Sequence, residues 1–148
     1  MQRVVFFVDK THLLRCYRFS ADDDEWEEVD LAHGNASPPK VDEQSKLSGS
    51  FLPGGGAVVL FQTCSKVFQG IVIRDWKTRQ WESLPKIPVN YQPGTSHSFH
   101  FGLEGKDDHH ILYVNQDNSI HHLKGQALDR IADWNGKSLP PSKLSWHH

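Results

Sequence analysis

The sequence predicts an all-β protein of three four-stranded antiparallel propeller blades. Short apolar runs rich in Val, Ile and aromatic residues, each bounded by turn residues, are typical of strands. Three aromatic residues mark the first run of successive copies at spacings of 54 and 52 residues: Phe7, Phe61 and Tyr113. Three tryptophans mark the last run of each copy at spacings of 55 and 53 residues: Trp26, Trp81 and Trp134.

A third marker follows each tryptophan, a short stretch of small residues that ends in an aromatic. It covers residues 47–51, 96–99 and 144–146. A repeat of about 50 residues is typical of propellers or solenoids. The sequence therefore predicts one domain over residues 1–148, divided at about 1–51, 52–99 and 100–148.

The strands of each copy are expected as follows. In the first copy they span residues 4–8 and 13–19, before the acidic turn 20–25, whose carboxylates lack the spacing of a calcium loop. In the second copy they span 57–62, 67–73 and 81–84, after a glycine-rich hairpin at 53–56. In the third copy they span 111–115 and 119–123, and residues 126–134 are expected to hold one helical turn.

The phase of the repeat predicts association. The chain begins on the second strand of a blade and ends on a copy of the marker that occupies a first strand. Propellers usually have four to eight blades, and an open array leaves sheet edges exposed. We expect a homodimer of six blades, in which each C-terminal strand completes a blade of the partner. A monomeric open array and a fragment of a longer protein are the alternatives.

Composition excludes several classes of protein. A net charge of −2 gives no basic field for nucleic acid, and no apolar run approaches the length of a membrane span. Without a recognisable signal peptide, we expect a cytoplasmic protein, or one secreted by another route. Cys16 and Cys64 have no metal-ligand spacing and are expected to be free thiols.

The third copy resembles the strand–turn–strand of the fungal fucose-specific lectins. The resemblance rests on residues 110–115 and 117–123, on the tryptophan that follows them, and on the marker strands ending in Phe51, Phe99 or Trp146. That resemblance implies a six-bladed propeller with sugar sites between neighbouring blades. The arginine and glutamate with which the family grips sugar are largely missing: the matching positions, about 58 or 110 and about 70 or 122, hold other residues, and only Arg3 falls close to a family arginine.

Candidate ligand-binding residues follow from chemistry at strand ends. Arg74, Asp75 and Trp76 end a strand, where a guanidinium beside an aromatic face suits sugars or planar ligands. The alternative is that Trp76 packs on the neighbouring blade with Arg74 stacked over it. Trp81 is a further ligand candidate, although its recurrence favours a blade wedge, and Tyr113 is expected mainly to pack.

Ten histidines are the unusual feature of the composition. His97 and His100 lie in a predicted strand, on opposite faces, which is poor geometry for a shared metal. His122 and its neighbours lie near the ends of partner strands, about where cross-strand pairs meet. These histidines are candidate ligand contacts, and neither a metal nor a cofactor is expected.

Three functions are compatible with the sequence. The first is a lectin-like module that binds a glycan or small organic ligand non-covalently in inter-blade or axial pockets. The second is a cofactor-independent enzyme, such as a cyclase or pericyclase, that uses a propeller cavity. The third is a protein-interaction scaffold. Hydrolase and nucleotide-binding motifs are missing, so we place binding first.

Overall fold

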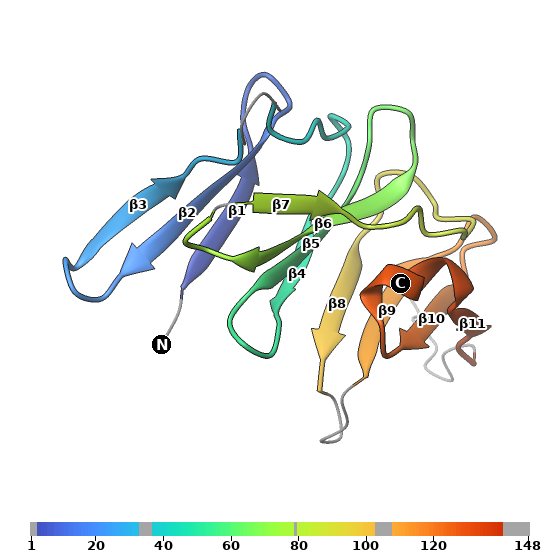
Figure 1. The fold of residues 1–148 in the computed structure, drawn as a ribbon. Helices are drawn as coiled ribbons and strands as arrows, with labels where there is room; N and C mark the ends of the chain where they lie inside the picture. The colour runs from blue at the N-terminus through green and yellow to red at the C-terminus, as the bar shows by residue number, and fades with distance from the viewer. Residues whose placement is uncertain (1–2, 33–36, 79, 103–107, 141–148) are drawn as a thin grey trace, which may run out of the picture.

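The computed structural model describes residues 3–32, 37–78, 80–102 and 108–140. Within these residues the chain forms three antiparallel sheets, here named blades 1 to 3 (Figure 1). Blade 1 consists of β1 (Val4–Val8), β2 (Leu14–Ser20) and β3 (Glu25–Val29). Blade 2 consists of β4 (Ser48–Phe51), β5 (Ala57–Gln62), β6 (Phe68–Asp75) and β7 (Gln80–Ser83). Blade 3 consists of β8 (His97–Phe101), β9 (His109–Val114), β10 (Ile120–Gly125) and β11 (Asn135–Ser138).

Each blade is a meander in which consecutive strands pair. The turns between them have a chemical cause: at the β9–β10 hairpin, Asp117 Oδ1 accepts a hydrogen bond from the backbone amide of Ser119 at 2.9 Å. Asn118, between them, has a φ of 68°, a left-handed conformation that asparagine tolerates better than most residues. The expected helical turn is the 3₁₀ helix η2 (Leu128–Asp133).

The core lies between the blades, so each inner sheet face is buried by its neighbour. One apolar cluster joins Leu14 and Cys16 of blade 1 to Val59 and Ile71 of blade 2. The other cluster joins the opposite face of blade 2 to blade 3, and includes Val58, Val72, Ile111 and Leu123. This explains why β5 is buried at every position: both of its faces meet another sheet.

The small-residue markers form the strands β4 and β8, which lie side by side as the first strands of blades 2 and 3 (Figure 1). The chain enters blade 1 on a strand that corresponds to β5 and β9, as predicted for its N-terminal end. Blade 1 accordingly has three strands among the described residues, and blades 2 and 3 have four. The third marker, residues 144–146, lies outside the described residues.

The three tryptophans lie at equivalent positions of their blades but have different neighbours. Each lies at the start of the last strand of its blade, in β3, in β7 and just before β11. The indole of Trp81 donates a hydrogen bond to the carbonyl of Leu31 in the preceding blade segment at 2.5 Å. Trp134 packs against the cluster between blades 2 and 3. No blade precedes Trp26 among the described residues, and this side chain is 47 % exposed.

Candidate functional site: a groove between two blades

A groove of about 480 Å³ opens between one end of blade 2 and the corresponding end of blade 3. Blade 2 contributes the β4–β5 turn and the end of β6, and blade 3 contributes the facing ends of β8 and β9 and the segment leading into η2. The lining residues are Leu52, Pro53, Arg74, Phe101, His109, Gln126, Ala127, Leu128 and Asp129. The groove therefore combines a guanidinium, a carboxylate, an amide and two aromatic rings.

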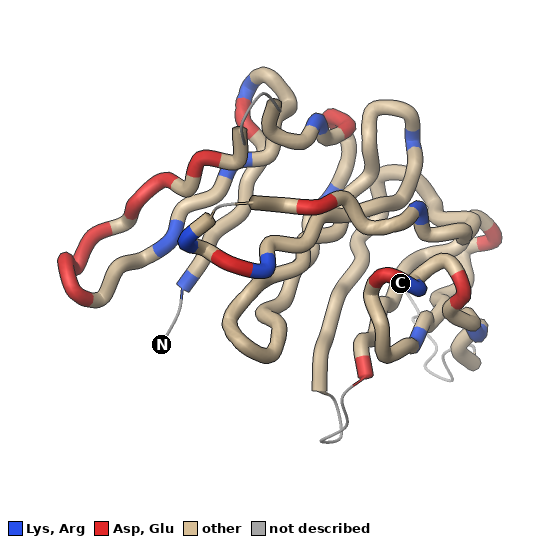
Figure 2. The backbone as a smooth tube through the Cα atoms, viewed as in Figure 1, with Lys and Arg blue, Asp and Glu red and all other residues tan. Residues whose placement is uncertain are grey.

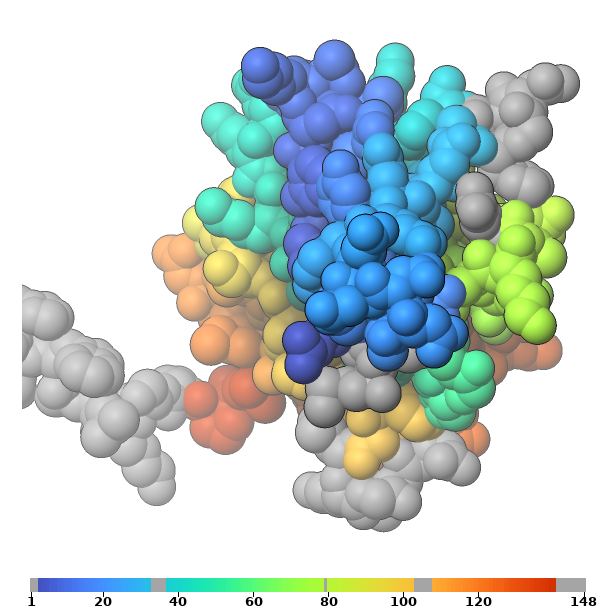
Figure 3. Space-filling model, turned by 90° about the vertical axis from the view of Figure 1, so that its left-hand side faces the viewer, coloured from blue at the N-terminus to red at the C-terminus, as the bar shows by residue number. Residues whose placement is uncertain are grey.

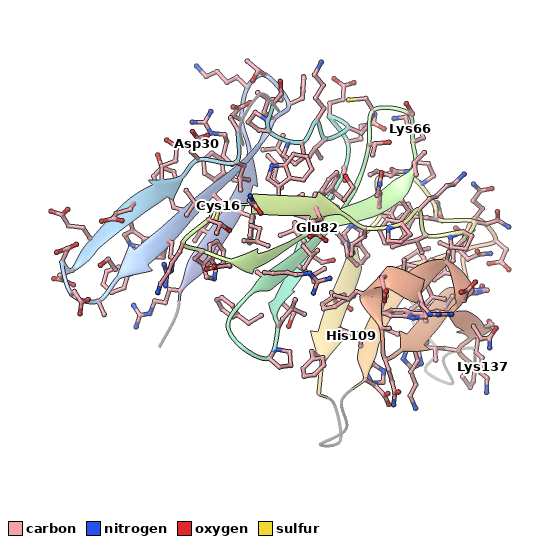
Figure 4. All side chains as sticks on the ribbon, viewed as in Figure 1. Cys16, Asp30, Lys66, Glu82, His109 and Lys137 are labelled. Atoms are coloured by element: carbon pink, nitrogen blue, oxygen red, sulfur yellow. The ribbon has the colours of Figure 1, made fainter. Side chains whose placement is uncertain are left out.

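His109 is the most deeply buried polar residue of this groove, with 7 % of its surface exposed. Its ring lies 4.9 Å from the ring of Phe101 and is stacked at 5.9 Å on Trp134. Figure 4 labels it at the start of β9. Burial lowers the pKa of His109, against the smaller raising effect of hydrogen bonds to the backbone of Gly125 and Gln126. The ring is therefore neutral at pH 7.

Within the described part of the chain, Nδ1 of His109 has no hydrogen-bond partner. Buried side-chain nitrogens nearly always have one, so this enclosed nitrogen in the wall of the groove indicates a partner from outside the described chain, such as a water molecule. A neutral imidazole that carries its proton on Nε2 presents Nδ1 as an acceptor. Such an acceptor suits a hydroxyl donor.

Gly125 fixes the position of the aromatic wall behind His109. A Cβ atom built on Gly125 would lie 2.1 Å from the indole of Trp134. Only glycine lets this indole lie directly over the end of β10, where its Nε1 donates to the carbonyl of Ala127 at 3.1 Å. The missing side chain at Gly125 thus leaves the space that the Trp134 indole fills.

Arg74 supplies the positive charge at the blade 2 side of the groove. It lies near the end of β6, and its Nε is 3.8 Å from Oε2 of Glu82. Both side chains are more than half exposed, so this ion pair holds the guanidinium only weakly. The guanidinium is consequently available to a ligand.

The junction between blades 1 and 2 has the same kind of residues in a different arrangement. Trp76 is buried there, and its Nε1 donates to the carbonyl of Gly55 at 2.7 Å. The guanidinium of Arg18, from blade 1, lies 5.6 Å from the centre of the indole. Trp76 does pack on the neighbouring blade, and the arginine over it is Arg18 rather than Arg74.

The structure distributes the predicted site residues over several places. Of the eight, only Arg74 lines the groove between blades 2 and 3. Asp75 is exposed and accepts a hydrogen bond from the amide of Lys77 at 2.9 Å, which fixes the β6–β7 turn. Trp76 and Trp81 both lie toward blade 1, as described above.

His97 and Tyr113 come together in a second place, at the contact of blades 2 and 3. Both rings pack on Phe68, with ring centres 5.0 Å and 6.2 Å away. Tyr113 is 4 % exposed, so it packs as expected. Two further predicted residues lie elsewhere: His100 is exposed on β8, and His122 stacks on His110 with ring centres 5.0 Å apart.

Two classes of site find no support in the described ranges. No three histidine, cysteine or carboxylate residues there are grouped so that they could hold a metal ion. The helices among those residues include none with the length and apolarity to span a bilayer. The chemistry on offer in the groove is hydrogen bonding, charge and aromatic contact.

Sequence reasoning missed His109, Phe101, Gln126 and Asp129. The strand register does contain a signal that could have indicated the grooves between blades. A lysine or arginine recurs near the end of the same strand in each blade. Arg18 pairs with Val4, Lys124 pairs with His110, and Arg74 directly follows Ile73, the partner of Ala57. Each of these cations therefore lies on the face that points to the following blade.

No protein-family model matches the sequence, and no curated protein matches it. Solved structures do. AofleA from Arthrobotrys oligospora is similar with a TM-score of 0.74 and 15 % identity over 97 % of this chain and 41 % of that chain. A mutant of Aleuria aurantia lectin in complex with alpha-methyl-L-fucoside has a TM-score of 0.66 and 18 % identity over 96 % and 47 %. A fucose lectin from Kordia zhangzhouensis in complex with methyl-fucoside has a TM-score of 0.61 and 11 % identity over 92 % and 89 %.

These likenesses establish the fold. The chain is all-β and propeller-like, and its structural neighbours include the Aleuria aurantia lectin and the Kordia fucose lectin, which confirms the resemblance drawn from the third repeat. The chain spans less than half the length of the two fungal proteins. The Kordia lectin, in contrast, has a chain that this one nearly covers.

Proposed function

We propose that this protein is a lectin-like module that binds carbohydrate in the groove between blades 2 and 3. The observation that carries the proposal is one groove whose walls include both the imidazole of His109, with an unpaired Nδ1, and the exposed guanidinium of Arg74. A sugar presents hydroxyl groups that both donate and accept hydrogen bonds. An imidazole acceptor and a guanidinium donor on opposite walls match that pattern.

The remaining lining residues fit the same ligand class. Asp129 and Gln126 add a carboxylate and an amide, and Phe101 and Leu128 add apolar surface against which the C–H face of a sugar ring can pack. His97 and His100 do not line this groove.

Titration calorimetry with methyl α-L-fucoside is the first test, because the Aleuria and Kordia structures contain fucosides. Screening on a glycan array extends the test to other sugars. Removing the guanidinium in Arg74→Ala should weaken binding about 10- to 100-fold, since hydrogen bonds to charged groups contribute about 1.5–3 kcal/mol. The exposed Arg74 side chain stabilises the fold little, so the variant should remain folded.

His109→Phe keeps an aromatic ring of similar shape among Phe101 and Trp134 and removes the acceptor nitrogen. It should reduce binding about as strongly as Arg74→Ala. Lys77→Ala, on the β6–β7 turn outside the groove, is the matched control and should bind as the wild type does. Failure to bind any sugar on the array, or unchanged affinity in both groove variants, would refute the proposal.

A further inference from the structure

Two histidines meet on the outer face of blade 3, the sheet face that points away from blade 2. His110 lies on β9 and His122 on β10, and Nδ1 of His110 is 2.8 Å from Nε2 of His122. The two ring planes are within 8° of parallel, and the ring centres are 5.0 Å apart. Both side chains are only partly buried, so the pair is open to small solutes.

The register of the sheet brings these two rings together. His110 pairs directly with Lys124, and His122 pairs directly with Leu112. Residues directly opposite each other share a sheet face, so the two histidines are diagonal neighbours on one face. Ile111 and Leu123 alternate with them and are buried in the core with blade 2. That core holds the two strands, so the imidazoles are carried by a rigid sheet.

The contact between the two nitrogens is one that a metal ion can replace. A hydrogen bond between neutral imidazoles needs a proton on one nitrogen and a lone pair on the other. When each ring carries its proton on the remaining nitrogen, Nε2 of His110 and Nδ1 of His122, both facing nitrogens present lone pairs and no proton is gained or lost. Rotation of each ring about its Cβ–Cγ bond then aims both lone pairs at one ion. Neutral imidazole is the commonest metal ligand in proteins.

The separation of the nitrogens indicates which metal suits the pair. Metal–imidazole bonds of about 2.0–2.1 Å place two nitrogens about 2.8–3.0 Å apart at a right angle and about 3.3–3.4 Å apart at a tetrahedral angle. The observed separation of 2.8 Å matches the right angle. Right angles occur in the tetragonal coordination of copper(II) and nickel(II), whereas zinc prefers a tetrahedron. Copper(II) also binds such ligands most tightly among the first-row divalent metals.

Two imidazoles make an open, exchangeable site. Structural zinc sites use four protein ligands, and catalytic ones use three. In the described part of the chain, no three candidate ligands are grouped around one point. His100 pairs with His110 across β8 and β9 and is exposed on the same face. His110 and His122 therefore leave the other positions of the ion to water.

Two lysines lie beside the pair, and their charges oppose the binding of a cation. Lys124 is opposite His110, and Lys137, which Figure 4 labels on β11, is opposite His122. The ammonium of Lys124 is 3.4 Å from the buried carboxylate of Asp108, which offsets its charge. Lys137 is exposed. Its charge is the one that a substitution can change with the least effect on the fold.

We propose that His110 and His122 bind one divalent first-row metal ion, copper(II) in preference to nickel(II) and zinc(II). The ligands are Nδ1 of His110 and Nε2 of His122, and water completes the coordination. Neither residue lines the groove between blades 2 and 3. The metal site is therefore independent of carbohydrate binding, and its failure would leave that proposal unaffected.

The chain offers a second surface to cations, which the test must separate from the histidine pair. Acidic residues gather along β3 and the turn before it, in blade 1, as Figure 2 shows. Figure 3 looks onto this end of the molecule, where the blue surface of blade 1 faces the viewer. Carboxylates suit magnesium and calcium, whereas imidazoles suit copper and nickel. An excess of calcium chloride therefore competes for the acidic surface and leaves the histidine pair free.

Equilibrium dialysis of the full chain against copper(II) chloride, with calcium chloride in excess, measures the site. One copper ion per chain should bind tightly, and its electron paramagnetic resonance spectrum should show coupling to two imidazole nitrogens. His110→Gln and His122→Gln should each weaken binding at least about 10-fold, because loss of even a partner of a metal ligand costs 10–100-fold. Both residues are partly exposed and glutamine keeps polar atoms, so both variants should fold.

His121→Gln is the matched control. His121 is the neighbour of His122 on β10, but it lies on the opposite face, where it pairs with Tyr113. Its variant should bind copper as the wild type does. His100→Gln should also keep the affinity, and an equal loss there would overturn the assignment to a pair. Replacement of His147 and His148 by asparagine should leave the bound ion in place, and loss of the tight site in that variant would overturn the proposal.

Lys137→Glu provides a gain-of-function test that does not depend on the stability of the histidine variants. It removes a positive charge opposite His122 and adds a carboxylate, so copper should bind at least about 3-fold more tightly. A purely structural role of the histidine pair predicts no such gain, and unchanged affinity would place the ion elsewhere. The proposal would also be overturned by a wild type that binds no copper, by full affinity in both His110→Gln and His122→Gln, or by tighter binding of zinc than of copper.

Discussion

Ser48 Oγ and His97 Nδ1 lie 2.5 Å apart at the contact between the first strands of blades 2 and 3. The other ring nitrogen, Nε2, is 3.1 Å from the carbonyl oxygen of Lys46 and must donate to it. Nδ1 of the neutral ring therefore accepts the proton of the Ser48 hydroxyl. One neutral histidine thus links the two strands nearest the centre of the blade array.

This arrangement predicts that acid destabilises the fold. Burial lowers the pKa of His97 from 6.5 to about 4, against a smaller opposing effect of the Lys46 carbonyl. The unfolded chain consequently binds a proton at this residue between pH 6.5 and 4 that the folded chain does not. The free energy of unfolding should fall across that range by roughly 3 kcal/mol through this residue. Urea titrations at a series of pH values measure the fall.

His97→Gln is the test variant, because it keeps polar atoms and removes the titration. Its unfolding free energy should be lower at pH 7 and should vary less with pH between 6.5 and 4. His100→Gln, at an exposed position of the same strand, should keep the wild-type pH dependence. Equal pH dependence of wild type and His97→Gln would contradict the role given to His97.

Gly125→Ala should damage the fold and the groove together. The new methyl group would meet the Trp134 indole at 2.1 Å, so the indole or the strand must move. Overpacking of this kind costs about 1–3 kcal/mol of unfolding free energy. Thermal unfolding, together with the near-ultraviolet spectrum of the tryptophans, should show both effects. Gly136→Ala, where the nearest atom is a Leu123 methyl at 3.3 Å, should change both measurements less.

The strands were predictable because their signals are local. An apolar run such as Ala57–Gln62, which forms β5, predicts a strand from its own residues alone. The recurrence of Trp26, Trp81 and Trp134 indicates the length of the repeat. The phase of the markers also predicted that the first blade would lack its first strand. None of this requires knowledge of how blades meet.

The groove was not predictable, because its walls come from different blades. His109 is not among the residues that the sequence predicts for the site, and its burial depends on Phe101, on Trp134 and on the absence of a side chain at Gly125. Trp76, in contrast, is of a residue type that often contacts ligands, but its indole already contacts the carbonyl of Gly55 and the guanidinium of Arg18. The sequence predicts the strand and the sheet face on which a side chain lies. The contacts of that side chain depend on the neighbouring blade, which the local sequence does not describe.

The two cysteines should differ sharply in reactivity. Cys16 is buried between blades 1 and 2, and burial raises the pKa of its thiol to about 12. Because the thiolate is the reactive form, Cys16 should resist alkylation at pH 8 in the folded protein. Cys64 is exposed and should react. Mass spectrometry after iodoacetamide treatment should find one modified residue in the native chain and two in urea. Rapid native labelling of Cys16 would contradict its burial.

The His110–His122 pair should make the fold sensitive to acid. Nδ1 of His110 is 2.8 Å from Nε2 of His122, a contact that requires one nitrogen to be unprotonated. Burial first, and then the charges of His110 and Lys124, lower the pKa of His122. The unfolded chain therefore binds a proton at His122 more readily than the folded chain does, and the free energy of unfolding should fall through this residue as the pH falls below about 6.5.

His122→Val should reduce this pH dependence in urea titrations between pH 7.5 and 5.5. His12→Asn, in a blade 1 turn, should keep the wild-type response. A His122→Val variant with the wild-type pH dependence would contradict the role given to His122.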